Sequence, residues 1–236
     1  RGQTFKSIIN TLENELNYHV IGVKKDKNGE LVYDKKSFIR NTKNFGLPKN
    51  SPRVYIVAFS REYYGKHLEM LPKETPTEGR KEIFHSVLDI LQPKVSEKYF
   101  LSSGLLKTLE NHKTRQKNNG NGFGYRIVND TTADRPLAHT ILATGGSGKE
   151  RNLIYDPVNG KSIIGKDVPP KKTPINDKCI RTMTPEEWGR LQGFIGYAFL
   201  DENGTERFSF PEKMSDQQMF KQFGNSVSIP LIEEMV

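Results

Sequence analysis

Cysteine is nearly absent from this 236-residue sequence, in which Cys179 is the single example. One cysteine cannot form an internal disulfide, and a cysteine-rich zinc site needs several, so both are excluded. No apolar run of about 18 residues or more occurs, and the sequence therefore predicts no membrane-spanning helix. The first residues also lack the charged and apolar segments of a signal peptide, and we expect a cytoplasmic protein.

Acidic residues are fewer than basic ones. The 36 Lys and Arg residues outweigh the 28 Asp and Glu residues, and the resulting net charge of +8 favours an anionic partner such as nucleic acid. Charge alone does not separate a nucleic-acid-binding protein from a basic protein that has no such partner. The hydrophobic share of 34% is too high for a disordered chain, and the length allows one large domain or two small ones.

The start of the chain has the alternation of helix and strand that is typical of an α/β domain. Apolar residues at helical spacing predict an amphipathic helix over residues 4–17, with Thr4 as its N-cap. Asn-Gly at positions 28–29 lies between β-prone segments and predicts a type I′ hairpin. The run "RVYIVAF", residues 53–59, predicts a strand that is buried on both faces.

Changes in composition divide the chain into three segments. The composition changes from about Glu62, after which comes the linker-like "LPKETPTEG", residues 71–79, and the Pro- and Lys-rich "PPKKTP" precedes residue 178. The predicted segments are residues 1–65, 66–177 and 178–236. The chain begins with Arg instead of Met and ends within a helical pattern, so we expect it to be part of a longer protein.

The glycine-rich stretch "ATGGSGKERN" has three possible interpretations. A nucleotide phosphate loop is disfavoured, because its Lys should be followed by Ser or Thr and then by a helix, whereas here Glu150 and a strand-like run follow. The stretch is also compatible with a loop that presents Ser147, Lys149 and Arg151 to DNA, or with a plain hairpin turn.

Few other residues have the spacing of a catalytic or metal site. No pair of histidines is placed to share one metal ion, and we predict that the chain binds none. Lys178 and Arg181 are near enough to Cys179 to lower the pKa of its thiol, but neither a Pro-Cys turn nor a helix start surrounds it. Cys179 therefore fits a reactive thiol poorly.

Near the C-terminus, Thr184 and Glu187 predict a helix that begins with a capping box, and Pro185 suits its first position. The longer stretch "RTMTPEEWGRLQGF", followed by "FGNSVSIPL", closely resembles the ninth and tenth sequence motifs of the cytosine-5 DNA methyltransferases. Upstream, "NFGLPKNSPRVYIVAF" resembles the segment that runs into the eighth motif of that family. The resemblance extends from Thr4 to Leu231.

This resemblance implies a fold and an activity. The fold is the end of a doubly wound α/β methyltransferase sheet, residues 1–65 and 178–236, with a smaller mixed, β-containing target recognition domain at residues 66–177. The activity is transfer of a methyl group from S-adenosylmethionine to C5 of a cytosine that is flipped out of double-stranded DNA. We expect a bacterial, nucleoid-associated enzyme, and a restriction-modification system is its usual setting.

The resemblance also implies roles for single residues. The "GNSV" sequence of the family lies beside the methyl donor, which makes Asn225, Ser226 and Val227 cofactor-binding candidates. Asn225 or Ser226 is alternatively the cap of a following helix.

The eighth motif of the family is Gln-x-Arg-x-Arg, and its last Arg stabilises charge on the cytosine during attack. This sequence reads Lys-Asn-Ser-Pro-Arg, so only Arg53 matches, as the catalytic candidate. Its structural alternative is an Arg at a strand start, paired with an acidic residue.

The ninth motif supports the recognition region in the family. Arg181, Arg190 and Gln192 are therefore predicted to be structural residues that donate hydrogen bonds to backbone carbonyls. Lys149 and Arg151 are the leading candidates for reading base edges in the major groove.

The glycine-rich cofactor loop, the Pro-Cys-Gln nucleophile and the Glu-Asn-Val acid of the family do not occur in this sequence. Because the reaction needs a thiolate, we predict that the fragment is inactive alone and requires an N-terminal catalytic part, in the same protein or in a separate chain. One alternative is a non-catalytic DNA-binding module or the recognition subunit of a two-chain enzyme. Another is methylation of structured RNA.

Overall fold

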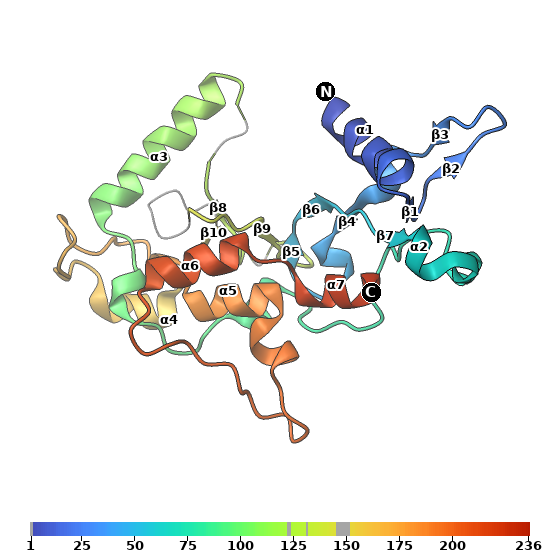
Figure 1. The fold of residues 1–236 in the computed structure, drawn as a ribbon. Helices are drawn as coiled ribbons and strands as arrows, with labels where there is room; N and C mark the ends of the chain where they lie inside the picture. Colours follow the sequence, from blue (N-terminus) through green and yellow to red (C-terminus); the bar gives the residue numbers. More distant parts are fainter. Residues whose placement is uncertain (1, 122–123, 131, 145–151) are drawn as a thin grey trace.

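The computed structural model describes residues 2–121, 124–130, 132–144 and 152–236 (Figure 1). Its α-helices are α1 Gln3–Asn10, α2 Arg61–Tyr64, α3 Ser103–Asn118, α4 Pro157–Gly160, α5 Pro185–Gln192, α6 Asp216–Asn225 and α7 Ile229–Met235. Its strands are β1 Tyr18–Val20, β2 Lys24–Lys25, β3 Leu31–Val32, β4 Ile39–Asn41, β5 Lys49–Asn50, β6 Pro52–Val54, β7 Ala58–Ser60, β8 Arg126–Ile127, β9 Ala138–His139, β10 Asn152–Tyr155 and β11 Ile180–Thr182.

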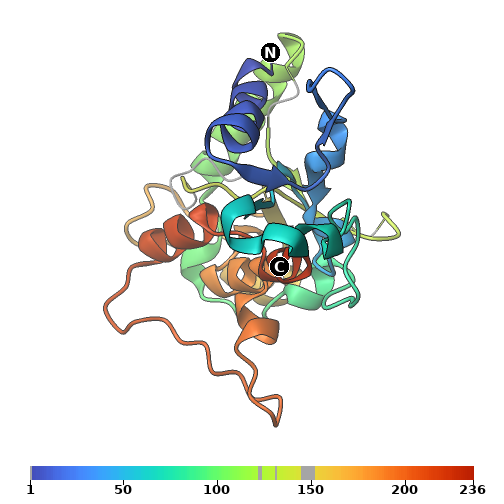
Figure 2. The ribbon, with the colours of Figure 1, turned by 45° about the vertical axis from the view of Figure 1, so that its right-hand side comes forward.

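Within these ranges the strands form five small sheets. Four are pairs, β1–β7, β2–β3, β4–β6 and β5–β9, and the fifth has the order β11–β10–β8. The predicted mixed α/β class is therefore confirmed. In Figures 1 and 2 the orange segment between α5 and α6 extends away from the rest of the molecule. None of the described helices combines the length and apolar character needed to cross a membrane.

The N-terminal helix confirms most of the prediction for residues 4–17. α1 continues directly into a π-helical turn at Thr11–Glu15. The prediction of Thr4 as the cap is wrong, because the N-cap is Gly2, whose φ of 107° lies in the left-handed region. Glycine adopts that backbone at little cost, so the helix starts without a side-chain cap. Ile9 is fully buried in the small core that holds this helix against β1.

The predicted hairpin exists, but its turn is not type I′. β2 and β3 pair in an antiparallel register. A type I′ turn needs positive φ at both central residues, and of the Asn28-Gly29 pair only Gly29 has it, with φ 83°. The Asp26 carboxylate closes the loop instead, by accepting hydrogen bonds from the backbone N–H groups of Asn28 at 2.8 Å and Glu30 at 2.9 Å.

The prediction of one doubly buried strand over residues 53–59 is wrong. The stretch is divided between β6, which pairs with β4, and β7, which pairs with β1. All three residues of β6 are exposed, and Val54 keeps 54% of its surface. The residues of β7 are only partly buried, so neither strand is covered on both faces.

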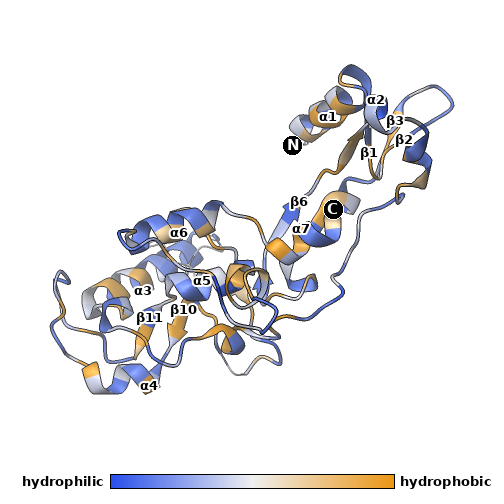
Figure 3. Cartoon of the chain, turned by 60° about the horizontal axis from the view of Figure 1, so that its bottom comes forward, coloured by the Kyte–Doolittle hydropathy of each residue, from blue (hydrophilic) through white to orange (hydrophobic). Residues whose placement is uncertain are grey.

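The strand that is covered on both faces is β10. Consecutive strand residues point to opposite faces of a sheet. Leu153 faces a core that includes Leu106 of α3, whereas Ile154 faces the main core with Trp188 of α5. Both β10 residues are fully buried. Figure 3 shows the apolar β10 close to α5.

The C-terminal helix α7 packs against the N-terminal region of the chain. Leu231 and Met235 of α7 pack against Phe45, which follows β4. Figures 1 and 2 place α7 beside the strands of the N-terminal region and away from α3. Earlier in the chain, α5 packs on α6 through Trp188 and Phe220, whose ring centroids lie 4.8 Å apart.

A buried ion cluster fixes the start of α5. The guanidinium of Arg181, on β11, is fully buried and donates to Asp156 Oδ2 at 2.8 Å and to Glu187 Oε1 at 2.8 Å. Glu187 also accepts from the backbone N–H of Thr184 at 2.9 Å, and the predicted capping box is confirmed. Burial by itself raises the pKa of the Asp156 carboxyl, but hydrogen bonds from Asn159 and Arg181 outweigh it and hold that pKa below its usual value.

Removing the cation should cost far more than losing an exposed ion pair. We predict that Arg181→Ala lowers the free energy of unfolding by about 3–5 kcal/mol, because two buried carboxylates lose their shared partner. Urea titration followed by the fluorescence of Trp188, the one tryptophan, measures this. The control is Arg207→Ala, which removes an exposed pair with Asp201 and should change stability little. Equal effects of the two substitutions would contradict the prediction.

Candidate functional site

A cleft of about 60 Å³ lies where four distant stretches of the chain meet. The first contains β5 and β6, the second follows β9, the third is the end of α5, and the fourth is the turn between α6 and α7. Figure 1 shows β5 and β6 beside the start of α7. The residues that line the cleft are Thr42, Lys49, Ser51, Arg53, Tyr55, Thr140, Ile141, Gln192, Gly224, Ser226, Val227 and Ser228.

The strand side of the cleft presents every second residue. Lys49, Ser51 and Arg53 all line it, as expected for alternate positions that share one face. Thr140 donates from Oγ1 to Ser51 Oγ at 3.1 Å. Arg53 is exposed and donates to the carbonyl of Pro52 at 2.9 Å. It has no ion pair with a described residue, so the alternative of an Arg paired with an acid gains no support.

The opposite side is the turn between α6 and α7. Ser226 and Val227 line the cleft, whereas Asn225 is the exposed last residue of α6 and does not. Ser226 donates from Oγ to the Phe223 carbonyl at 2.8 Å. The N-cap of α7 is Ser228, which makes no side-chain cap bond, so the alternative of Asn225 or Ser226 as the cap of this helix is wrong.

Gln192 joins the two sides. Its Nε2 donates to the carbonyls of Phe223 at 2.8 Å and Ser226 at 3.2 Å, which fixes the turn. Its Oε1 accepts hydrogen bonds from Lys49 Nζ and from Ser228 Oγ. The side chain is almost completely buried, and both ends of the amide are engaged. The bonds to backbone carbonyls are of the predicted kind, and the structural role of Gln192 stays a prediction.

Two glycines let the backbones approach closely. Gly193 ends α5 with φ 80°, and a Cβ there would also lie 2.7 Å from Pro230 Cδ. A Cβ on Gly224 would lie 2.4 Å from the carbonyl carbon of Leu142 and 2.5 Å from the backbone nitrogen of Ala143. Gly224 therefore packs directly against the backbone of the stretch that follows β9.

Lys49 is the least expected member of the site. Its side chain is almost fully buried, and its ammonium group contacts Gln192 and Ser228. Burial, and to a smaller extent the neighbouring cation of Arg53, lowers the pKa of Lys49 from 10.5 to about 7. A lysine that titrates near neutral pH is uncommon outside functional sites.

The other two residues predicted to be structural lie outside the cleft. Arg190 donates from Nη1 to the Ile90 carbonyl at 2.8 Å, the kind of bond that was expected. Arg181 donates to the Thr182 carbonyl at 3.0 Å, but its strongest contacts are with carboxylates. Both side chains connect α5 and β11 with neighbouring segments, and their structural role stays a prediction.

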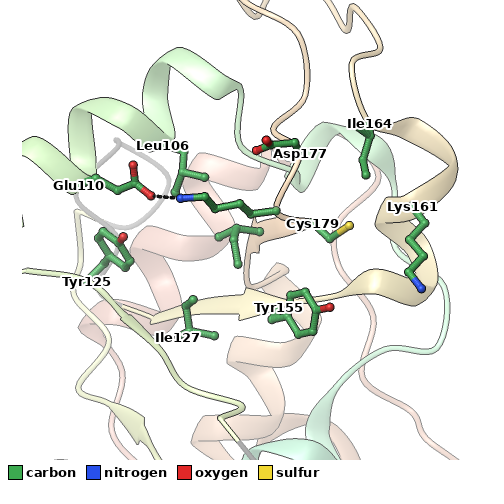
Figure 4. Close-up of a pocket in the computed structure, with 11 residues that line it drawn as sticks. Leu106, Glu110, Tyr125, Ile127, Tyr155, Lys161, Ile164, Asp177 and Cys179 are labelled. Carbon is green, nitrogen blue, oxygen red and sulfur yellow. Dashed lines mark hydrogen bonds and ion pairs between the residues drawn. The ribbon is translucent and has the colours of Figure 1, made fainter.

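Cys179 lies in a second, separate cavity of about 490 Å³ (Figure 4). Burial raises the pKa of its thiol, which disfavours the thiolate that nucleophilic attack requires. The rim of this cavity carries an ion pair between Lys178 Nζ and Glu110 Oε1 at 2.7 Å. No residue of the first cleft lines it.

The DNA-binding candidates Ser147, Lys149 and Arg151 lie outside the described residues, so their contacts stay a prediction. Among the residues that the structure does describe, no group of His, Cys, Asp and Glu side chains is arranged to hold a metal ion.

Comparison with known proteins identifies the family. The family model for C-5 cytosine-specific DNA methylases matches residues 1–236, which is the whole chain. The chain belongs to this family.

Individual members of the cytosine-5 methylase family are similar along nearly the whole chain. The type II methyltransferase M.HpaII of Haemophilus parainfluenzae is 35% identical over 234 residues, which cover 99% of this chain and 54% of that protein. M1.ScrFI of Lactococcus lactis subsp. cremoris is 31% identical over 232 residues, which cover 98% of this chain and 46% of that protein. The chain therefore spans about half the length of these curated relatives.

Solved structures support the methyltransferase fold. The Entamoeba histolytica methyltransferase EhMeth matches with a TM-score of 0.56 at 21% identity, over 98% of this chain and 55% of that one. A Spodoptera frugiperda DNMT2 mutant matches with a TM-score of 0.57 at 15% identity, over 98% of this chain and 60% of that one. At such identities the likeness concerns the fold alone.

Several residues that the methylase motifs selected line the first cleft, the one that contains Lys49. The cleft brings together Arg53, from the eighth motif, with Gln192, Ser226 and Val227, from the ninth and tenth. Lys49 occupies the first position of the eighth motif, where the family has Gln, and the motif comparison assigned it no role. Its alternation with Arg53 already indicated a second cation at this place. Gly224 is part of the "FGNSV" motif and could be found in the sequence. Its contact with residues 142–143 could not be predicted from the sequence.

The contact of Gly224 predicts an unusual sign for a helix substitution. Replacing a helical glycine by alanine normally stabilises a helix by about 0.5–1 kcal/mol. We predict that Gly224→Ala destabilises the protein instead, because the added methyl group overlaps backbone that cannot rotate away. Thermal and urea unfolding measure the effect. Gln217→Ala, at an exposed position of the same helix, is the matched control and should be neutral. A stabilising Gly224→Ala would show that the contact is absent.

Proposed function

We propose that the protein to which this chain belongs is a DNA (cytosine-5-)-methyltransferase. It transfers a methyl group from S-adenosylmethionine to C5 of a cytosine that is flipped out of a specific duplex sequence. The observation that carries the proposal is the cleft in which Arg53 faces Ser226 and Val227. Family membership and the net charge of +8 support the same function.

Arg53 acts on the cytosine side of the reaction. Attack on the ring places negative charge on the pyrimidine, and a fixed guanidinium near the carbonyl oxygen stabilises that charge as it develops. The side chain is exposed at the cleft and has no acidic partner among the described residues, so its charge remains available. The β4–β6 pairing, with Arg40 opposite Arg53, fixes the backbone that carries it.

The turn at residues 225–227 acts on the donor side. When bound, S-adenosylmethionine supplies an electrophilic methyl group. Val227 keeps 51% of its surface for apolar contact, and Asn225 offers an exposed amide. Ser226 and Val227 line a cleft of about 60 Å³, far smaller than the roughly 300 Å³ of typical ligand pockets, so in this proposal the turn supplies only part of the donor site.

The nucleophile must come from elsewhere in the protein. Cys179 is buried, has a raised pKa and lies in a different cavity from Arg53. We propose that the catalytic thiolate is supplied by an N-terminal part of the same protein, or by a separate chain, and that this segment alone transfers no methyl group.

The proposed partner is double-stranded DNA, read by a recognition domain at residues 66–177. The catalytic side would comprise residues 1–65 and 178–236, and the packing of α7 against Phe45 supports that grouping. Ser147, Lys149 and Arg151 remain the proposed contacts with DNA.

Methylation sequencing tests the function. DNA from cells that express the full-length protein is sequenced with single-base detection of 5-methylcytosine, and cells with an empty vector are the control. We expect methylation of one cytosine within one short recurring sequence. A purified protein that binds duplex DNA without methylating it would support the non-catalytic module instead, and methyl transfer to transfer RNA alone would overturn the DNA substrate.

Arg53 supplies a sharper test of the mechanism. In the complete enzyme, we predict that Arg53→Ala lowers the single-turnover rate of methyl transfer by about 10²–10³-fold, the usual effect of removing one charge-stabilising donor. Duplex binding should weaken far less, because the cation acts on the transition state. Arg53→Lys should recover part of the rate, and Arg207→Ala is the exposed control. Mutant and parent rates that agree would refute the role.

A further inference from the structure

Lys49 is a buried cation without a carboxylate partner. Its exposed fraction is 3%, and none of the ion pairs among the described residues includes it. The nearest charge that acts on it is Arg53, which has the same sign. Burying a charge without an opposite one is costly, so a buried lysine here needs a reason beyond packing.

The ammonium group closes a ring of hydrogen bonds. Lys49 Nζ donates to Gln192 Oε1 and to Ser228 Oγ, the latter at 3.0 Å. Ser228 in turn donates to Gln192 Oε1 at 3.0 Å, and Thr42 Oγ1 lies 3.1 Å from Ser228 Oγ. Three separate segments, which carry Thr42 and Lys49, Gln192, and Ser228, therefore meet at one buried polar network.

This ring joins the two sides of the cleft. Lys49 on β5 is four residues before Arg53 on β6, and both line the cleft, whereas Gln192 donates to the Ser226 carbonyl at the other side. A shift of the turn relative to the strand must therefore break bonds to the ammonium group. The segment that carries Arg53 and the segment that carries Val227 are connected through one side chain.

We propose that Lys49 is a positioning residue, whose charged ammonium group holds the donor-side turn at residues 225–227 in register with Arg53. The proposal rests on the proposed methyltransferase function and assigns to that site a residue for which the family motif has glutamine. A neutral glutamine can donate hydrogen bonds in the same place, but a charged donor makes stronger ones.

Protonation of Lys49 should govern how firmly the turn is held. With its pKa lowered to about 7, the ammonium is charged below that pH and becomes a weaker, neutral donor as the pH rises through it. Arg53 and Tyr55 line the cleft together with Lys49, His139 of β9 lies opposite Asn50, and Arg40 of β4 lies opposite Arg53. The carboxylates of α5 and α7 bind other partners: Glu186 with Gln92, Glu187 with Arg181, Glu233 with Tyr197, and Glu234 with Arg80.

The test compares Lys49→Met and Lys49→Gln with the parent in the complete protein, and Lys36→Met, at an exposed position, is the control. Calorimetry measures the binding of S-adenosylmethionine at pH 6 and pH 8.5. We expect Lys49→Met to weaken donor binding about tenfold at pH 6, because the substitution removes a charged hydrogen-bond donor and replaces it with none. At pH 8.5 the parent and Lys49→Gln should bind alike, because both then present neutral donors.

Two further measurements separate positioning from folding. Amide hydrogen exchange over residues 224–228 should become faster in Lys49→Met while the exchange of β10 stays unchanged. The KM for the donor should rise while the affinity for duplex DNA changes less than about twofold. An unchanged donor affinity at pH 6, or faster exchange throughout the protein, would overturn the proposal.

Failure of the proposed function gives a different result. If the parent binds the donor but methylates no DNA, the function fails and the donor affinities still decide the role of Lys49. If the parent binds no donor at all, hydrogen exchange at the turn decides it, and unchanged exchange in Lys49→Met overturns the proposal.

Discussion

The buried guanidinium of Arg181 is the interaction on which the rest of the molecule depends. It pairs with Asp156, the N-cap of α4, and with Glu187, which completes the capping box of α5, so one cation contacts the starts of two helices. α5 is only 8 residues long and carries Gln192 at its other end. At about 1.5 Å per residue, the helix is a short rigid connection from the ion cluster to the cleft.

Local chemistry explains which elements the sequence predicted correctly. The capping box at Thr184, the amphipathic helix near the N-terminus and the hairpin around Gly29 depend on residues a few positions apart. The errors concern contacts with distant residues. Residues 53–59 have a sequence suitable for a buried strand, but they are divided between two small sheets. The strand that is buried on both faces is β10.

The sequence predicted several residues of the site, but not the hydrogen bonds and backbone contacts that join them. Motif resemblance selected Arg53, Ser226 and Gln192, which the fold brings to one cleft although they are far apart in sequence. The buried place of Lys49 depends on partners 143 and 179 residues away, and no local pattern contains that information. Likewise, the need for glycine at 224 arises only when the backbone of residues 142–143 is in place.

The contact at Gly224 has a consequence for how such a protein can diversify. The chain is anchored at residues 142–143 by this contact, and again at Asn152, whose amide exchanges hydrogen bonds with the backbone of His139 at 2.8 and 3.0 Å. Both contacts use backbone atoms of residues 139, 142 and 143. Evolution can therefore change the side chains of Leu142 and Ala143 while the backbone contact that shapes the cleft is kept.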